Sequence, residues 1–336
     1  MIQYRCRCGH QLFCENTRCG NCGRMVTFEP LTQQMLSLDD DGESWVDANG
    51  VRYRPCDNRR DFRVCNGVVE ITDSHRLCSA CRLNRTIPTM ERAENQLRWR
   101  RLEAAKRRMI ADVSKRGLDV TGLRFDFLED KRSHPEVQEQ FVATGHKDGV
   151  ITINVLEADE LERVKQREMM GERYRTVLGH FRHEAGHFFY PVLMKHCSGF
   201  EVLFGDPNTD YGAALTLYYE NGPPDDWQSR YISRYASSHP LEDWAECFAH
   251  LLHIEDTLET ALTYGLIPDS GSSIAERLSC WARFAIPLNE LSRGLGQRDY
   301  YPFILTETVI EKLSFVSDAI EAHRGAQLST VVHPAD

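Results

Sequence analysis

The distribution of cysteine constrains this 336-residue chain more than any other feature, because nine of its twelve cysteines lie within the first 81 residues. Residues 1–84 are also rich in arginine and turn-forming residues, and they show little helical or strand periodicity. In a cytoplasmic protein, cysteines paired at short spacing indicate bound metal rather than disulfides. The sequence therefore predicts a small metal-stapled module over residues 1–84. Cys197, Cys247 and Cys280 stand far apart and are predicted to be small buried side chains.

The first set of four cysteines predicts a zinc site. It combines two short spacings, Cys6-x-Cys8 and Cys19-x-x-Cys22. Four thiolates arranged in this way match the tetrahedral geometry of Zn²⁺. His10 is an alternative ligand, and Cys14, which lies between the two pairs, is predicted to be a packing residue.

A second set of four predicts another zinc site. Its members are Cys56, Cys65, Cys78 and Cys81. The Cys78-x-x-Cys81 half has the usual spacing, whereas the other half is wide, so free buried thiols are the alternative. Because neither set leaves a coordination position open, both zinc ions are predicted to be structural.

The rest of the chain predicts helices and a small sheet in separate segments, which is an α+β arrangement. Apolar residues at helical spacing over 85–117, with Pro88 in the first turn, predict a connecting helix within residues 85–120. Residues 123–128, 140–144 and 150–155 read as strands of a small sheet, with antiparallel pairing expected around the turn at Asp148-Gly149.

Helices are expected after that sheet. The expected spans are residues 161–190 with a break near Gly171 and an end or kink at Pro191, residues 213–220, and a helix from Pro240 capped by Ser238 or His239. Residues 198–238 look rich in loops. We expect one catalytic domain over residues 121–325 and a loose tail over residues 326–336.

The string His183-Glu184-Ala185-Gly186-His187 predicts a catalytic metal site. Histidines four residues apart lie on one face of a helix and reach one Zn²⁺ together. Glu184 is placed to take a proton from a zinc-activated water. The apolar residues of the segment fall on the opposite face: Leu178, Phe181, Ala185, Phe188 and Val192. A pair of surface or capping histidines is the alternative interpretation.

The third metal ligand is sought on the helix that begins at Pro240. Its apolar face is Trp244, Cys247, Phe248 and Leu251, and its other face carries Glu242, Glu246, Ala249, His250 and His253. Glu242 is assigned as the third ligand and Glu246 as the acceptor of a histidine N–H, with Asp243 or Glu246 as rival ligands. His250 and His253 lie too far along the helix to join Glu242, so they bind substrate or sit on the surface.

The chain resembles bacterial zinc-binding metallopeptidases that carry an N-terminal zinc ribbon. The strings that carry the resemblance are Cys6-x-Cys8-Gly9, Cys19-x-x-Cys22-Gly23, Cys78-x-x-Cys81-Arg82-Leu83-Asn84-Arg85-Thr86-Ile87-Pro88, His183–His187, His239-Pro240-Leu241-Glu242-Asp243-Trp244-Ala245-Glu246 and Tyr301-Pro302-Phe303. The order His183, His187 and then Glu242 also resembles the gluzincin, thermolysin-like clan. That likeness implies a zincin-like domain, Glu242 as ligand with Glu246 supporting it, and an edge strand at residues 150–155.

An oxyanion-stabilising side chain should face the zinc. Tyr235 and His239 are the predicted catalytic partners of Glu184, with Tyr218 as a further candidate, because they lie in the insert before Glu242 or at the start of its helix. The expected activity is hydrolysis of a peptide or isopeptide bond. The alternatives are a zinc-ribbon adaptor with an inactive zincin-like scaffold and a zinc hydrolase of a non-peptide amide.

Charge bears on location and partners. The net charge of −10 argues against a general nucleic-acid binder. Arginines nevertheless recur in the cysteine-rich module and along the next helix. The plainer interpretation is that they form a solvated face. The alternative is that this basic surface docks an acidic protein or nucleic acid. Residues 1–6 lack the features of a signal peptide and no run of 18 apolar residues exists, so a cytoplasmic protein without a membrane span is expected.

Overall fold

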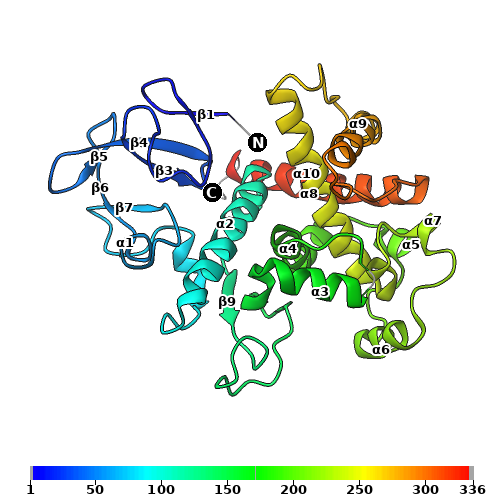
Figure 1. Cartoon of the computed structure of the whole chain (residues 1–336). Coiled ribbons are helices and arrows are strands. Elements are labelled where there is room, and N and C mark those ends of the chain that lie inside the picture. Colours follow the sequence, from blue (N-terminus) through cyan, green and yellow to red (C-terminus); the bar gives the residue numbers. More distant parts are fainter. Residues whose placement is uncertain (1–2, 171, 333–336) are drawn as a thin grey trace. The chain divides into compact units, whose positions relative to one another are not determined.

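The computed structural model describes residues 3–170 and 172–332, and the chain divides into two compact units between Lys165 and Gln166. Most helices and several strands of the two units are labelled in Figure 1. The division falls within helix α3 (Glu160–Met170), inside the segment 121–325 that the sequence predicts as one domain. The predicted α+β class is confirmed: strands lie in the N-terminal unit and the C-terminal unit is mostly helical.

The cysteine-rich module of the N-terminal unit is built on antiparallel strands. A hairpin of β1 (Tyr4–Arg5) and β2 (Gln11–Leu12) comes first. A five-stranded antiparallel sheet follows in chain order: β3 (Met25–Glu29), β4 (Gln34–Asp40), β5 (Trp45–Val46), β6 (Arg52–Pro55) and β7 (Val68–Glu70). Helix α1 (Asp57–Phe62) connects the last two strands. The guanidinium of Arg59 on α1 donates to the carbonyls of Val26, Asn66 and Thr17, which fastens the helix to the rest of the module.

A second sheet of the same unit is mixed rather than purely antiparallel. Its order is β10 (Gly145–Lys147), β11 (Val150–Asn154), β9 (Arg124–Leu128) and β8 (Asn84–Thr86). The β10–β11 hairpin turns at Asp148-Gly149, whose φ angles of 50° and 79° suit a tight hairpin turn, so that prediction is confirmed. Strand β11 pairs on both sides, so the implied edge position of residues 150–155 is wrong; β10 and β8 lie at the edges of the described sheet.

The strand expected over residues 140–144 is absent from the described structure. Both backbone groups of Val142 bond to side chains instead, because its N–H donates to Asp130 Oδ2 at 3.0 Å and its carbonyl accepts from Asn154 Nδ2 at 3.0 Å. These polar side chains replace a ladder partner, which a pattern of alternating residues does not reveal.

Helix α2 (Ala93–Lys115) begins later than predicted, because residues 84–86 form strand β8. Pro88 therefore precedes the helix rather than starting it. The buried face of α2 carries Trp99, Leu102, Met109, Ile110 and Val113, and apart from the adjacent pair Met109 and Ile110 their spacings are three, four or seven residues.

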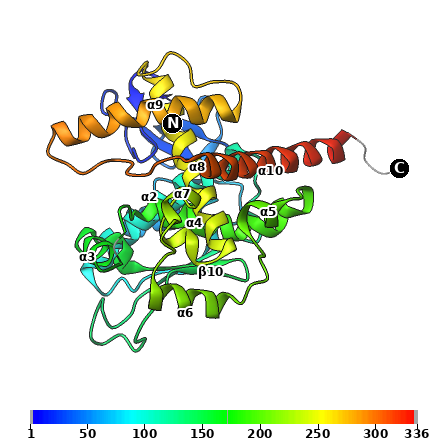
Figure 2. The ribbon, with the colours of Figure 1, turned by 90° about the vertical axis from the view of Figure 1, so that its right-hand side faces the viewer.

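Helices make up most of the C-terminal unit. They are α4 (Val177–Leu193), α5 (Phe200–Phe204), α6 (Tyr211–Asn221), α7 (Trp227–Arg230), α8 (Pro240–Thr263), α9 (Ile274–Gly294) and α10 (Glu307–Val332). Helix α4 packs against α8, and α10 contacts both. Figure 2 shows α10 as one long helix and α6 at the periphery of this unit.

The crossing of α4 and α8 is close because Gly186 lies at the contact. A methyl group built at Gly186 would come within 3.0 Å of Ala245 Cα and 3.1 Å of Phe248 Cβ. The indole of Trp244 donates to the Gly186 carbonyl at 2.9 Å, which fixes the register of the two helices. Phe181 and Ala185 are buried as predicted, and Phe189, rather than Phe188, completes the buried face of α4.

Several helix boundaries test the sequence predictions. His239 caps α8, since its side chain accepts from Leu241 N, and α6 falls where a short helix was expected. Pro191 does not end α4, which continues to Leu193. The predicted loose tail over 326–336 is wrong as far as Val332, because α10 extends that far; residues 333–336 lie outside the described residues. Within residues 3–170 and 172–332, every helix is too short or too polar to cross a lipid bilayer.

Candidate metal centres

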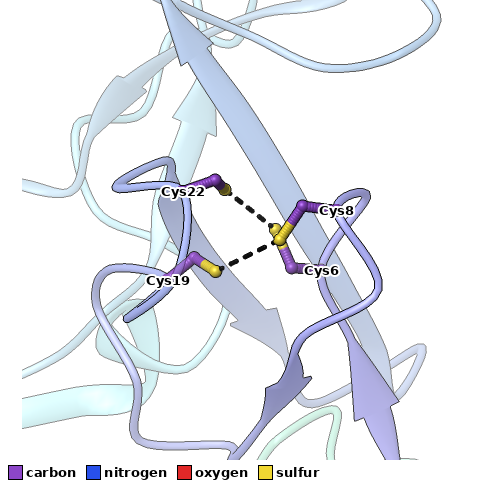
Figure 3. A group of neighbouring side chains, drawn as sticks. All are labelled: Cys6, Cys8, Cys19 and Cys22. Carbon is purple, nitrogen blue, oxygen red and sulfur yellow. Dashed lines mark hydrogen bonds between the residues drawn. The ribbon is translucent and has the colours of Figure 1, made fainter.

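The first four-cysteine set comes together in the structure. In Figure 3 the sulfurs of Cys6, Cys8, Cys19 and Cys22 point toward one another. The Cys6 and Cys22 sulfurs lie 3.6 Å apart, as do those of Cys8 and Cys19. Each pair stands on a turn closed by a glycine with positive φ, and the Gly9 and Gly23 amides donate to the Cys6 and Cys19 carbonyls. Four thiolates at these distances surround a space that suits one Zn²⁺.

The second set also converges, and all four of its sulfurs are buried. The members are Cys56, Cys65, Cys78 and Cys81. Gly67 is required here, because a methyl group on it would lie 2.4 Å from the Cys78 sulfur. The buried guanidinium of Arg107 donates to the Cys78 sulfur at 3.6 Å. A positive charge at this position offsets the negative charge that four thiolates and one Zn²⁺ leave in a buried site.

The arginines of the module are largely engaged within it. Arg7 and Arg24 pair with Asp39, and Arg60 pairs with Asp57 and Asp61. On α2, Arg107 and Lys106 are buried. The eleven arginines of residues 1–84 are also matched by eleven aspartates and glutamates. These pairings weaken the argument for a basic docking surface on the module.

The HExxH residues lie on α4 and meet α8 at Glu242. The Nε2 atom of His183 lies 3.2 Å from Nε2 of His187 and 3.0 Å from Oε2 of Glu242. The distance from His187 Nε2 to Glu242 Oε1 is 3.3 Å. One donor atom from each of the three side chains falls within 4.8 Å of the others. Two imidazoles and one carboxylate are the donor set of open zinc sites with three protein ligands, so the residues fit that ion.

The electrostatics of the cluster fit a cation as well. Burial lowers the pKa of His183, but hydrogen bonds and charges from Glu242 and Glu246 outweigh burial and hold it well above its usual value. Burial raises the pKa of Glu242, yet the two histidines hold it well below its ordinary range. The carboxylates thus favour positive charge at the place where the three side chains converge.

Glu246 contacts the other nitrogen of the His183 ring. Its Oε1 atom lies 2.8 Å from His183 Nδ1, and its Oε2 atom accepts from the Ser233 hydroxyl at 2.5 Å. This is the position predicted for a carboxylate that orients a metal-binding histidine. Ser233 was not singled out in the sequence, because nothing in its local pattern links it to a residue on α8.

Glu184 is buried beside the cluster. Burial raises the pKa of its carboxyl group, and the charge of Glu242 adds to that effect, while His183 and His187 oppose it. A carboxylate whose proton affinity is raised is better suited to take a proton from water near neutral pH.

Asp243, the rival ligand, points elsewhere. Its Oδ2 atom accepts from the Lys312 ammonium at 2.6 Å, and its Oδ1 atom accepts from the Cys247 thiol at 3.7 Å. Asp243 and Lys312 are both buried. The geometry therefore favours Glu242 over Asp243 as the third donor.

His250 and His253 are neither surface residues nor part of the cluster. Both are buried; His250 Nδ1 lies 2.8 Å from the Tyr301 hydroxyl, and His253 Nδ1 lies 2.5 Å from Arg182 Nη1. The surface position expected for them is wrong, and these partners tie α8 to neighbouring segments.

The three oxyanion candidates differ in their surroundings. Both ring nitrogens of His239 are engaged, Nδ1 by the Leu241 amide and Nε2 at 3.0 Å from the Thr209 carbonyl, so a structural role is favoured. The Tyr235 ring lies 5.9 Å from the His183 ring, and Tyr218 packs edge-on against Tyr235 at 6.0 Å. Tyr235 therefore lies beside the metal-ligand cluster, whereas the ring contact of Tyr218 is with Tyr235.

Tyr211 is a second residue that sequence reasoning missed. Its hydroxyl donates to Oε1 of Glu242 at 2.5 Å, although 31 residues separate the two. Partial burial and the charge of Glu242 raise the pKa of this phenol, so it stays protonated and able to donate. Tyr211 is the first residue of α6 and Glu242 lies near the start of α8, and no sequence pattern links these two positions.

Comparison with known families gives two matches. The model of a family described as "Putative zinc-binding metallo-peptidase" matches residues 95–319, and the model of a zinc-ribbon domain matches residues 3–92. The first match covers most of α2, strands β9, β10 and β11 of the second sheet, and the helices that carry the histidine cluster, whereas β8 falls in the second match.

Relatives among curated proteins come from mycobacteria. They include an uncharacterized protein of Mycobacterium bovis and uncharacterized proteins of two strains of Mycobacterium tuberculosis, CDC 1551 and H37Rv. Each is 35% identical to this chain over 343 residues, which covers 96% of this chain and 96% of the relative. No solved structure matches the chain.

Proposed function

The chain belongs to this zinc-binding metallo-peptidase family, and from that membership and the geometry of the histidine cluster we propose that it hydrolyses a peptide or isopeptide bond. The observation that carries the proposal is the meeting of His183, His187 and Glu242, with their donor atoms within 4.8 Å and Glu184 beside them. The open three-ligand donor set suits hydrolysis, whereas the four-cysteine sets suit structural zinc.

Each residue has a proposed role. His183, His187 and Glu242 hold the zinc ion, and Glu246 keeps the His183 ring in place through Nδ1. When bound, zinc lowers the pKa of water and polarises the carbonyl group that is attacked. Glu184 takes the proton of the attacking water and passes it to the leaving amine. Tyr235 is the nearer of the remaining oxyanion candidates.

Several finer assignments belong to the same proposal. A gluzincin relationship is supported by the order His183, His187, Glu242 and by the place of Glu246 four residues after Glu242. A zincin-like fold of the catalytic region and a cytoplasmic location are proposed with it. The substrate is a peptide or protein; because the arginines of the cysteine-rich module are largely paired, docking of a macromolecule there is not part of the proposal.

A peptide-library assay tests the activity. The zinc-loaded full chain is incubated with a mixed peptide library and the products are identified by mass spectrometry, in parallel with Glu184→Gln at equal zinc content. Loss of the general base should slow cleavage by about 10²–10⁴-fold. Cleavage at the same rate in both proteins would contradict the assigned role of Glu184, and no cleavage by either would favour an adaptor with an inactive scaffold.

A further inference from the structure

The first residue of α6 reaches the metal cluster from outside the two helices that build it. The Tyr211 hydroxyl donates to Glu242 Oε1 at 2.5 Å, while Oε2 of the same carboxylate lies 3.0 Å from His183 Nε2. We propose that Tyr211 is a positioning residue, whose phenol holds the Glu242 carboxylate in the orientation that faces the two histidines. This inference rests on the proposed role of Glu242 as a metal ligand.

The backbone next to Tyr211 is tied to the helix that carries Glu242. His239, the N-cap of α8, has its Nε2 atom 3.0 Å from the Thr209 carbonyl, and its ring packs edge-on against Tyr211 at 5.0 Å. The same ring accepts from Leu241 N at 3.0 Å. The imidazole of His239 thus joins the start of α6 to the start of α8. This link keeps the Tyr211 hydroxyl next to the Glu242 carboxylate.

Hydrophobic burial does not explain the position of α6. None of its described residues is buried, and Leu217 and Tyr219 are 62% and 60% exposed. Glycines with positive φ, Gly205 and Gly222, stand before and after the helix. The contacts of Tyr211 with His239 and Glu242 at its N-terminal end, together with the packing of Tyr218 on Tyr235, therefore hold the helix beside the cluster.

The Glu242 oxygen that accepts from Tyr211 is also the one that lies 3.3 Å from His187 Nε2, so the phenol holds an oxygen at the place where the histidines converge. Hydrogen-bond partners of a ligating carboxylate affect metal binding strongly. An ionised Glu242 only accepts hydrogen bonds, so the Tyr211 hydroxyl is the donor of this pair. Tyr211→Phe removes the hydroxyl and keeps the ring that packs on His239. The variant therefore isolates the hydrogen bond from the packing of the helix.

The test measures zinc affinity and the cobalt spectrum of the exchangeable site in the full chain. The zinc that a His183→Ala/His187→Ala variant fails to bind defines that site, and Co²⁺ is loaded there while the cysteine sites keep zinc. Tyr211→Phe should weaken zinc binding by about 10–100-fold in chelator competition and shift the cobalt d–d bands. Tyr219→Phe, on the same helix with its ring against Tyr218, is the matched control and should leave both unchanged.

The outcomes separate this inference from the proposed function. If Tyr211→Phe matches the wild type in affinity and spectrum while the histidine variant loses the ion, Tyr211 does not position Glu242 and the metal site stands. If the histidine variant keeps the ion, both proposals fail. A Tyr211→Phe protein that melts far below the Tyr219→Phe control would assign the effect to folding and would also overturn the inference.

Discussion

The Nδ1 atom of His183 lies 2.8 Å from Oε1 of Glu246, on the opposite side of the ring from the nitrogen that faces Glu242. An Nδ1–H that donates to a carboxylate leaves the Nε2 lone pair free for a metal ion and raises its basicity. Glu242 and Glu246, four residues apart on α8, thus contact the two ring nitrogens of His183.

Glu246→Gln should weaken zinc binding at this site by about 10–100-fold, because a neutral amide accepts more weakly from Nδ1–H and raises the basicity of His183 Nε2 less than a carboxylate does. Glu255→Gln is the control, since Glu255 lies on the same helix and pairs with Arg277 at 3.2 Å. Chelator competition measures both variants. Equal zinc affinity in the two would show that the contact with His183 has no role in binding the metal.

Substitution of Lys312, the buried partner of Asp243, should lower the stability of the fold and leave metal binding intact. Lys312→Met leaves the buried Asp243 carboxylate without its ammonium partner, at a cost of about 3–5 kcal/mol in the free energy of unfolding. The double variant Asp243→Asn/Lys312→Met removes both charges and should recover much of that loss. Chemical denaturation measures stability, and zinc analysis of the double variant checks the ligand assignment: loss of one zinc ion would make Asp243 a ligand after all.

Gly186→Ala should destabilise the C-terminal unit by about 1–3 kcal/mol, because the added methyl group meets the backbone of Ala245 and the side chain of Phe248. The resulting shift between α4 and α8 should also weaken zinc binding, since the ligands come from both helices. Gly294→Ala at the end of α9 is the control, because nothing lies within 4 Å of its new methyl group. A Gly186→Ala protein as stable as this control would contradict the close packing.

Protonation of His250 in the unfolded chain should lower the free energy of unfolding in mild acid. Burial lowers its pKa to about 4, with Glu246 opposing this effect and His183 adding to it. Between the unfolded pKa of about 6.5 and pH 4, only the unfolded chain binds the proton, so stability is present above this window and is lost as the pH falls through it. His250→Gln should reduce the slope of unfolding free energy against pH by about 1.4 kcal/mol per pH unit. Denaturation curves at pH 7, 6 and 5 measure the slope; an unchanged slope would contradict a neutral buried His250.

The parts of the site with fixed local spacing could be predicted from the sequence. Cys19-x-x-Cys22 and His183-x-x-x-His187 bring their own members together through a turn and a helix, and structure around them adds little. Glu242 could be predicted as a ligand because an open zinc site needs a third protein ligand and α8 has few acidic residues on its polar face.

Other features depend on partners far along the chain. Asp243 meets Lys312 across 69 residues, and Tyr211 meets Glu242 across 31, so no pattern within either segment reveals the pair. The expected strand at residues 140–144 was wrong because side chains of Asp130 and Asn154 take the backbone bonds of Val142. Residues 326–332, expected to be a loose tail, belong to helix α10, and no proline interrupts the sequence there before Pro334.

Zinc content tests the central claim most directly. Elemental analysis of the purified full chain should give three zinc ions, one for each four-cysteine set and one for His183, His187 and Glu242. His183→Ala/His187→Ala should give two, with the cysteine sites retained. A variant that still holds three zinc ions would show that the histidine cluster is not a metal site, and the proposed hydrolase would fail with it.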